Sequence, residues 1–245
     1  MAIAAIVASA RVRAGKTLVA RLLAENFLLS GGRPVLLDTD TTEKRLWSFF
    51  PVETQLLDVD RVTDQMTLFE TLSVGTAEPR ILEVAHRSAK KFFELMRDAD
   101  YAAEARANDV EPVIFYIPSP DADSYEYGRQ LREQLPGCGF VVVQNAYLGE
   151  VKHMTRLSVG YRALEIVRPR VALPALDAAF IPVIDSPSFS LREFMRDPGT
   201  ELPPASRDTI RHWLVSCLRS TYSAVETIER KIAEVPSSEP GNFPL

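Results

Sequence analysis

Short apolar runs separated by longer amphipathic stretches dominate the pattern of hydrophobic and polar positions. The runs predict buried strands and lie at residues 3–8, 34–38, 80–85, 112–117 and 140–144, with a shorter one at 171–173. Helical spacing of apolar residues is found over 17–29, 67–72, 88–108, 123–135 and 206–233. Strands that are apolar throughout and alternate with helices indicate a mostly parallel sheet covered on both faces. The chain is therefore predicted to be a doubly wound α/β protein, with its ligand crevice at the carboxyl ends of the strands.

The composition is that of an ordinary globular protein and leaves this prediction unchanged. Hydrophobic residues make up 46% and charged residues 25% of the 245 residues. We expect a single domain over residues 1–235 and a disordered tail over 236–245, which is rich in Pro, Ser and Gly. The first apolar run is too short for a membrane span and lacks a basic flank, so a cytoplasmic location without a membrane span is expected.

Charge and metal-binding residue types narrow the possible functions. A net charge of −5 argues against a surface that binds nucleic acid throughout. Local basic clusters offer either direct DNA contact or a merely solvated surface; they comprise Arg87, Lys90, Lys91, Arg156, Arg162, Arg168 and Arg170. Neither a disulfide nor a zinc site is expected, because no cysteine or histidine has a companion at metal-ligand spacing. These residues are Cys138, Cys217, His86, His153 and His212.

A phosphate-binding loop is predicted between the first apolar run and the first helix. Residues 10–17 are ARVRAGKT, which fits G-x-x-x-x-G-K-[ST] except that Ala10 replaces the first glycine. Gly15 lets a phosphate approach the backbone, and the helix start supplies unpaired N–H groups. Lys16 suits the β- and γ-phosphates, and the Thr17 hydroxyl suits magnesium. The alternative interpretation is a plain strand-to-helix turn with an exposed lysine.

The predicted nucleotide contacts cover the whole loop and the start of the helix. They are Ala10, Arg11, Val12, Arg13, Ala14, Gly15, Lys16, Thr17 and Leu18. Alanine at position 10 and arginine at position 13 reduce backbone freedom where glycine is usual in such loops.

Two carboxylates follow the second apolar run. The segment LLDTD places Asp38 and Asp40 at the end of the neighbouring strand, on the crevice side. Such carboxylates can hold magnesium through water or orient an attacking water. Helix capping or turn formation is the alternative role for both.

The segments SARVRAGKT and GGRPVLLDTDTTEKRL together resemble the ParA/MinD group of deviant P-loop ATPases, which includes relatives on conjugative plasmids. Members of that group carry K-G-G-x-G-K-T followed by an L-x-D-x-D motif. The match covers residues 1–46, and strand order extends it to about residue 190. The resemblance implies a P-loop NTPase-like fold that binds ATP and Mg²⁺.

Individual roles also follow from the resemblance. Arg11 occupies the position of a signature lysine that reaches across a nucleotide-sandwiched dimer, although arginine is not equivalent to lysine. Asp40 matches the aspartate that positions the hydrolytic water, and Asn145 matches an asparagine that contacts adenine. Glu83 stands where an aspartate contacts the magnesium shell, with an ordinary charged strand end as the alternative. The resulting catalytic set is Lys16, Asp40 and Arg11, and the metal set is Thr17, Asp38, Asp40 and Glu83.

Three functions are compatible with these features. The first is a slowly hydrolysing ATPase switch, acting as a homodimer with a protein partner or a DNA-bound adaptor in plasmid partition, conjugation or cellular positioning. The second is a non-hydrolysing interaction module derived from a P-loop protein. The third is a metabolic ligase, for which no acceptor site is evident in the sequence. The apolar seam of the last helix predicts packing on the sheet, or alternatively an oligomer or partner surface anchored by Trp213.

Overall fold

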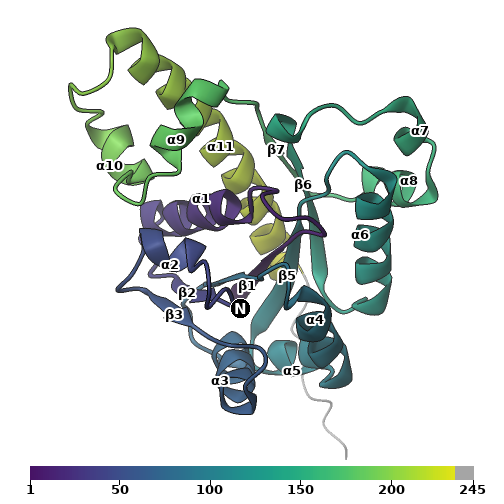
Figure 1. The fold of residues 1–245 in the computed structure, drawn as a ribbon. Coiled ribbons are helices and arrows are strands. Elements are labelled where there is room, and N and C mark those ends of the chain that lie inside the picture. The colour runs from purple at the N-terminus through teal and green to yellow at the C-terminus, as the bar shows by residue number, and fades with distance from the viewer. Residues whose placement is uncertain (235–245) are drawn as a thin grey trace, which may run out of the picture.

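The computed structural model describes residues 1–234, which build one seven-stranded sheet (Figure 1). The strands are β1 (Ala2–Ala8), β2 (Val35–Asp38), β3 (Thr54–Leu56), β4 (Arg80–Glu83), β5 (Val110–Tyr116), β6 (Gly139–Asn145) and β7 (Arg170–Leu173). Their order in the sheet is β3-β2-β4-β1-β5-β6-β7, and every pair is parallel. The predicted parallel sheet is therefore confirmed.

Helices cover both faces of the sheet. They are α1 (Lys16–Leu29), α2 (Arg45–Phe49), α3 (Val62–Ser73), α4 (Ala89–Asp98), α5 (Tyr101–Ala107), α6 (Ala122–Gln134), α7 (His153–Arg156), α8 (Val159–Glu165), α9 (Ile181–Ile184), α10 (Leu191–Arg196) and α11 (Pro204–Glu234). Two short 3-10 turns complete the list: η1 (Ala146–Leu148) follows β6, and η2 (Ala178–Phe180) precedes α9. One core lies between the sheet and α1, α10 and α11, and the other between the sheet and α3 to α6 with α8. The doubly wound arrangement expected from the sequence is thus observed.

The central strand β1 is buried along its whole length because it has core on both sides. Ala5 and Val7 face the α1–α11 side, whereas Ala4 and Ile6 face the other. β4 and β5 flank β1. The chain runs from β1 to β2 on one side of the sheet, and it later crosses from β4 to β5 on the other side of β1. A crevice forms at the carboxyl end of a strand with this position, and the loop after β1 lies there.

The short helices α2 and α7 to α10 were not predicted, and one strand and one long helix also differ from the sequence expectation. β3 was not predicted, since TQL is a three-residue edge strand without an apolar run. The single helix expected over 88–108 is wrong, because α4 ends at Asp98 and α5 begins at Tyr101. Asp100 takes a left-handed conformation with φ of 47° between the two helices, and no glycine or proline marks this break. The tail predicted over 236–245 lies outside the described residues.

The last helix packs within the domain through its apolar seam. Ile210, Leu214 and Cys217 are buried against the core that α11 shares with α1. Trp213 is also buried, and its indole Nε1 donates a hydrogen bond of 2.8 Å to the carbonyl of Pro174. The alternative role of Trp213 as a surface anchor is therefore wrong. No helix within residues 1–234, α11 included, is long and apolar enough to cross a bilayer.

Close packing of α8 on α6 depends on the absence of a side chain at Gly160. A Cβ atom there would lie 2.6 Å from the backbone nitrogen of Glu126, which cannot move without displacing α6. We predict that Gly160→Ala lowers the free energy of unfolding by about 1–3 kcal/mol, because overpacking outweighs a gain of about 1 kcal/mol in helix propensity. Urea unfolding measures this change. The control Val159→Ala, on the exposed side of α8, should stay within about 0.5 kcal/mol of the parent, and equal stability of all three proteins would contradict the prediction.

Candidate functional site

Free backbone N–H groups at the start of α1 form the centre of the candidate site. Within residues 1–234, no N–H from Val12 to Leu18 donates to an acceptor. Ser9 fixes the start of the loop, since its hydroxyl donates to the carbonyl of Ile117 at 2.8 Å and accepts from the N–H of Arg11 at 3.2 Å. A run of N–H groups at a helix N-terminus attracts a phosphate or another anion.

Gly15 is required by its conformation and by its neighbour. It caps α1 with φ of 98°, which L side chains rarely adopt. A Cβ atom at this position would also lie 2.8 Å from Nδ2 of Asn145. That amide donates to the carbonyl of Ala14 at 3.0 Å, so the end of β6 is tied to the phosphate loop.

The loop keeps the conformation of a glycine-rich segment with fewer glycines. Arg13 has φ of 56°, a left-handed conformation that costs a non-glycine residue about 1–2 kcal/mol. Lys16 begins α1 and is half-buried, and its charge acts on the carboxyl of Glu83. The sequence prediction that positions 10–18 surround one anion site is consistent with this geometry, although the individual contacts stay predictions.

Two buried carboxyl groups lie beside the start of α1, on paired positions of β2 and β4. Asp38 is directly opposite Glu83 in the register, and both are at most 5% exposed. The hydroxyl of Thr17 donates to Oε1 of Glu83 at 2.8 Å. Oε2 of Glu83 is buried and has no hydrogen-bond partner within the described residues. Lys16 acts on Glu83 only at longer range, and neither carboxyl forms an ion pair within residues 1–234, although buried like charges require one.

Burial and the charge of Asp38 raise the pKa of Glu83 to about 8, against the opposing effects of Thr17 and Lys16. Burial also raises the pKa of Asp38, whose carboxylate is stabilised by backbone N–H groups. A divalent cation beside Glu83 and Thr17 would take the place of the proton that the pair otherwise needs. Mg²⁺ prefers oxygen ligands of this kind, so the residues present fit a magnesium ion.

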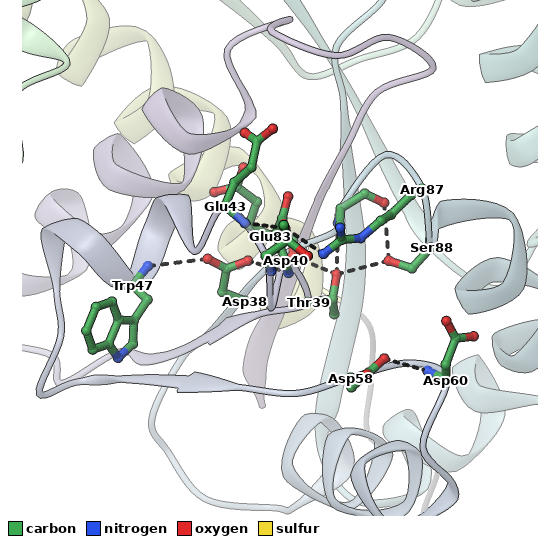
Figure 2. A network of polar contacts seen from close by, with 12 residues as sticks. Asp38, Thr39, Asp40, Glu43, Trp47, Asp58, Asp60, Glu83, Arg87 and Ser88 are labelled. Atoms are coloured by element: carbon green, nitrogen blue, oxygen red, sulfur yellow. Dashed lines mark hydrogen bonds and ion pairs between the residues drawn. The ribbon is translucent and has the colours of Figure 1, made fainter.

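Asp38 and Asp40 organise the loop that follows β2 (Figure 2). Asp38 accepts from the N–H of Asp40 at 2.8 Å, and its second oxygen accepts from the N–H groups of Leu46 and Trp47 at 3.0 and 3.3 Å. Both oxygens of Asp38 thus bind the start of α2 and the turn before it. The role of Asp38 as a metal ligand stays a prediction. Its charge acts on the neighbouring Glu83, whose pKa it helps to raise.

Asp40 lies at the outer end of the same network. Its Oδ1 accepts from the N–H groups of Thr42 and Glu43 at 3.1 and 2.9 Å, and from the guanidinium of Arg87 at 2.8 Å. Arg87 follows β4, so this ion pair joins the loops after two neighbouring strands (Figure 2). The alternative of turn formation describes the observed contacts, and the predicted role of Asp40 in positioning water is compatible with them.

Arg11 points away from the phosphate loop in this structure. Its guanidinium lies 3.0 Å from Asp121 and 3.9 Å from Asp123, at the start of α6. Asp121 also caps that helix by accepting from the N–H of Ser124. The pair is half-exposed, so solvent screens it and leaves it weak. The predicted catalytic role of Arg11 would require it to leave this pair.

A pocket of about 360 Å³ opens at the carboxyl ends of β5, β6 and β7, next to Asn145. Its walls include Pro118, Pro120, Tyr125, Leu173 and Pro174. Apolar walls of this kind suit a planar ring. Asn145 itself donates to Ala14 and accepts from the N–H of Tyr147 at 3.1 Å, so its predicted contact with a base stays a prediction. Sequence reasoning did not assign these wall residues, although prolines directly after two predicted strands were a usable signal.

The other candidate residues do not gather at a second site. Among residues 1–234, no group of three or more His, Cys, Asp and Glu side chains has metal-binding geometry. In the basic clusters, Lys91 pairs with Asp60 at 2.8 Å, and Arg168 and Arg170 donate to the carbonyl of Glu165. These contacts give several of the basic residues structural roles, and direct DNA contact stays a prediction.

The buried carboxyl of Glu83 makes stability depend on pH. Its pKa of about 8 exceeds the ordinary value of 4.5 expected in the unfolded chain, so the folded state retains a proton there that the unfolded state loses. Stability from this group is complete below pH 4.5 and is lost as pH rises toward 8. We predict that Glu83→Gln, which stays neutral, flattens this part of the pH profile in chelator-treated protein. Urea unfolding between pH 5 and 9 tests it, and an unchanged slope would contradict it.

Comparison with solved structures places the fold. No protein-family model matches the chain, and no curated protein sequence matches it. The chain resembles MinD in the MinC:MinD cell division protein complex of Aquifex aeolicus at a TM-score of 0.54 and 11% identity, covering 100% of this chain and 98% of that one. MinD of the same organism gives a TM-score of 0.53 at 12% identity over 89% and 95% of the two chains. The septum site-determining protein MinD of Pyrococcus horikoshii, complexed with Mg-ADP, gives 0.48 at 13% identity over 98% and 100%. The first two comparisons show that the chain shares the fold of MinD, a parallel α/β sheet of the P-loop NTPase-like kind.

Proposed function

We propose that this protein binds MgATP at the loop after β1 and works as a slowly hydrolysing switch of the ParA/MinD type. One observation carries the proposal: free N–H groups at the start of α1 lie beside Thr17 and the unpaired carboxyl oxygen of Glu83. An anion site and a cation site side by side are what a magnesium–triphosphate requires.

The phosphates would be held mainly by the backbone. The N–H groups of positions 12–18 supply donors that need no rearrangement, and Lys16 adds a full positive charge. Binding in this way depends little on the side chains at positions 10, 12 and 13. Residues other than glycine there raise the conformational free energy of the loop, but they leave its backbone N–H donors in place.

Thr17 and Glu83 would hold magnesium, and Asp38 would keep the neighbouring loop in place. Magnesium, when bound, neutralises charge on the phosphates and on the two carboxyls. Asp40 lies beyond this pair and, once released from Arg87, can accept a hydrogen bond from water. Catalysis would then consist of positioning and charge stabilisation, with Lys16 acting on the phosphate charge.

The pocket beside Asn145 supplies a place for the adenine ring. Its walls come from the segments after β5 and β7, and Asn145 links them to the phosphate loop. An adenine between the prolines and Tyr125 would be packed by apolar faces, and the amide group of Asn145 would meet its polar edge after rotating away from its turn.

The cellular role we propose is positioning or partition of a cargo, as in plasmid partition or conjugation. A nucleotide-dependent homodimer would act through a protein partner or a DNA-bound adaptor. Support comes from the fold, since a MinD neighbour was solved as a complex with MinC. Release of Arg11 from Asp121 would be necessary before it could serve a second subunit.

A non-hydrolysing interaction module is the second candidate, and a specific observation favours it. The residue at the signature position is paired within its own chain, and Arg13 keeps a strained loop conformation without glycine. Both features are compatible with nucleotide binding and with the loss of turnover. Measurement of phosphate release together with binding separates the two candidates.

Removal of the lysine charge should strongly weaken phosphate binding. We predict that Lys16→Ala weakens MgATP binding by about 100-fold or beyond detection, because a charged hydrogen bond contributes about 1.5–3 kcal/mol. Calorimetric titration of MgATP measures this, with Lys90→Ala on exposed α4 as the matched control. Unchanged affinity in Lys16→Ala would refute the phosphate site.

Loss of the Asp40 charge should separate binding from turnover. Asp40→Asn keeps an oxygen for the N–H groups of Thr42 and Glu43, so MgATP affinity should change less than about threefold. Phosphate release should fall about 100-fold, a loss of the size seen when a positioned proton acceptor is removed. Arg87→Ala is the control, since it breaks the same ion pair but retains the carboxylate. An Asp40→Asn rate equal to the parent's would remove this carboxylate from the mechanism.

A further inference from the structure

A second pocket lies far along α1 from the phosphate loop, where α1, α10 and α11 meet (Figure 1). Its volume is about 350 Å³. Leu29, Leu191, Met195 and Leu218 provide apolar walls, and Glu25 completes the lining from the last turns of α1. None of these residues belongs to the candidate nucleotide site.

Glu25 is a buried carboxyl with one oxygen, Oε2, that lacks a hydrogen-bond partner within the described residues. The residue is 4% exposed, and its Oε2 has no hydrogen-bond donor within residues 1–234. Burial raises the pKa of Glu25, although the charge and the backbone N–H of Arg192 oppose the shift. A buried acceptor without a hydrogen bond destabilises the fold, so a donor that enters the pocket and binds Oε2 would remove this penalty. The two carboxyl oxygens exchange easily by rotation of the terminal bond, which makes either one available to such a donor.

The rim of the pocket combines exposed apolar surface with positive charge. Leu29 is 66% exposed at the end of α1. Along α11, Val215, Leu218 and Tyr222 follow helical spacing, and Tyr222 is 48% exposed. Arg192 and Arg196 of α10 also line the pocket and take part in no ion pair among the described residues. Large apolar side chains at the surface beside a pocket mark a place where another molecule packs.

We propose that this pocket docks a partner protein through a tryptophan or tyrosine side chain that is flanked by acidic residues. An aromatic ring fits the apolar walls, and its N–H or O–H supplies the donor that Glu25 lacks. Acidic neighbours of the aromatic residue would meet Arg192 and Arg196 at the rim. A lysine-bearing segment fits less well, because these two guanidinium groups would repel its charge as it entered.

The first test uses model compounds of the aromatic anchor. Methyl-group NMR of the full chain follows titrations with N-acetyl-tryptophanamide and with its 1-methylindole counterpart, which lacks the N–H donor. We expect saturable shifts at Leu29, Leu191, Met195 and Leu218, and about tenfold weaker binding of the methylated compound. The peptide acetyl-Asp-Trp-Glu-amide should bind more tightly than the neutral compound, and Arg192→Ala with Arg196→Ala should remove only this advantage.

The second test replaces the carboxyl. Glu25→Met should raise the thermal midpoint or leave it unchanged, because it removes an unpaired buried acceptor and keeps a flexible apolar side chain. The variant should bind N-acetyl-tryptophanamide and its methylated counterpart equally, while MgATP affinity stays that of the parent. A marked loss of stability in Glu25→Met would overturn the proposal by showing that the carboxyl has a structural partner. Glu25→Gln then checks the conclusion, since an amide should keep part of the preference for the N–H compound.

Other occupants give different results, each of which overturns the proposal. Tighter binding of butylamine than of N-acetyl-tryptophanamide would assign the pocket to a small cationic ligand. A change in the same methyl signals on deletion of residues 235–245 would assign it to that segment of the chain. The absence of saturable shifts with every compound would show that the pocket has no ligand of this class.

Discussion

Two acidic side chains buried at paired positions of neighbouring strands are the constraint on which the candidate site depends. Asp38 and Glu83 are paired across β2 and β4, and both are buried. Each carboxyl contacts a different segment: Asp38 accepts from a backbone N–H at the start of α2, and Glu83 accepts from the hydroxyl of Thr17 in α1. The like charges cannot both remain ionised without a cation nearby. A proton on Glu83 relieves this repulsion, and the divalent cation that we propose beside Glu83 would relieve it in the same way.

The sequence predicted the structure best where a short sequence pattern matched a requirement of the whole fold, such as burial in the sheet or a left-handed glycine. Apolar runs identified the buried strands. GKT after such a run identified the turn into α1, where Gly15 has a φ of 98° and lies close to Asn145. Asp38 and Glu83 entered one predicted metal set on different grounds, Asp38 from its place after an apolar run and Glu83 from the resemblance to the ParA/MinD group. The edge strand β3 was missed for the opposite reason, since three residues on the rim of a sheet carry no hydrophobic pattern.

Contacts between distant segments could not be read from the sequence. Arg11 and Asp121 are separated by 110 positions, and only the packing of α6 beside the loop brings them together. The same holds for Asn145, which a motif suggested as a contact to a base but which also holds Ala14 across 131 positions. The break between α4 and α5 depends on the left-handed conformation of Asp100. Aspartate can adopt this conformation, but its presence in a sequence does not predict it. Resemblance to a family suggests which residues belong to a site, whereas the hydrogen-bond and ion-pair partners of those residues become known only from the tertiary structure.

One face of α1 connects the two sites discussed above. Thr17, Arg21, Glu25 and Leu29 follow each other at intervals of four residues, so they form a continuous row along the helix. Arg21 lies in the middle and is 2% exposed, with its guanidinium 3.7 Å from the Phe49 ring and donating to the carbonyls of Ile184 and Phe189 at 2.8 Å each.

Burial lowers the pKa of Arg21 to about 10, so the side chain remains charged at neutral pH. Separation of this charge from its carbonyl partners would leave it buried and unpaired, which is strongly unfavourable. The middle of the row therefore resists rearrangement. Transmission between two sites requires an element with two accessible arrangements, and a helix fixed in this way does not provide one. The loop after β1 and the Glu25 pocket should consequently act as independent sites on one rigid helix.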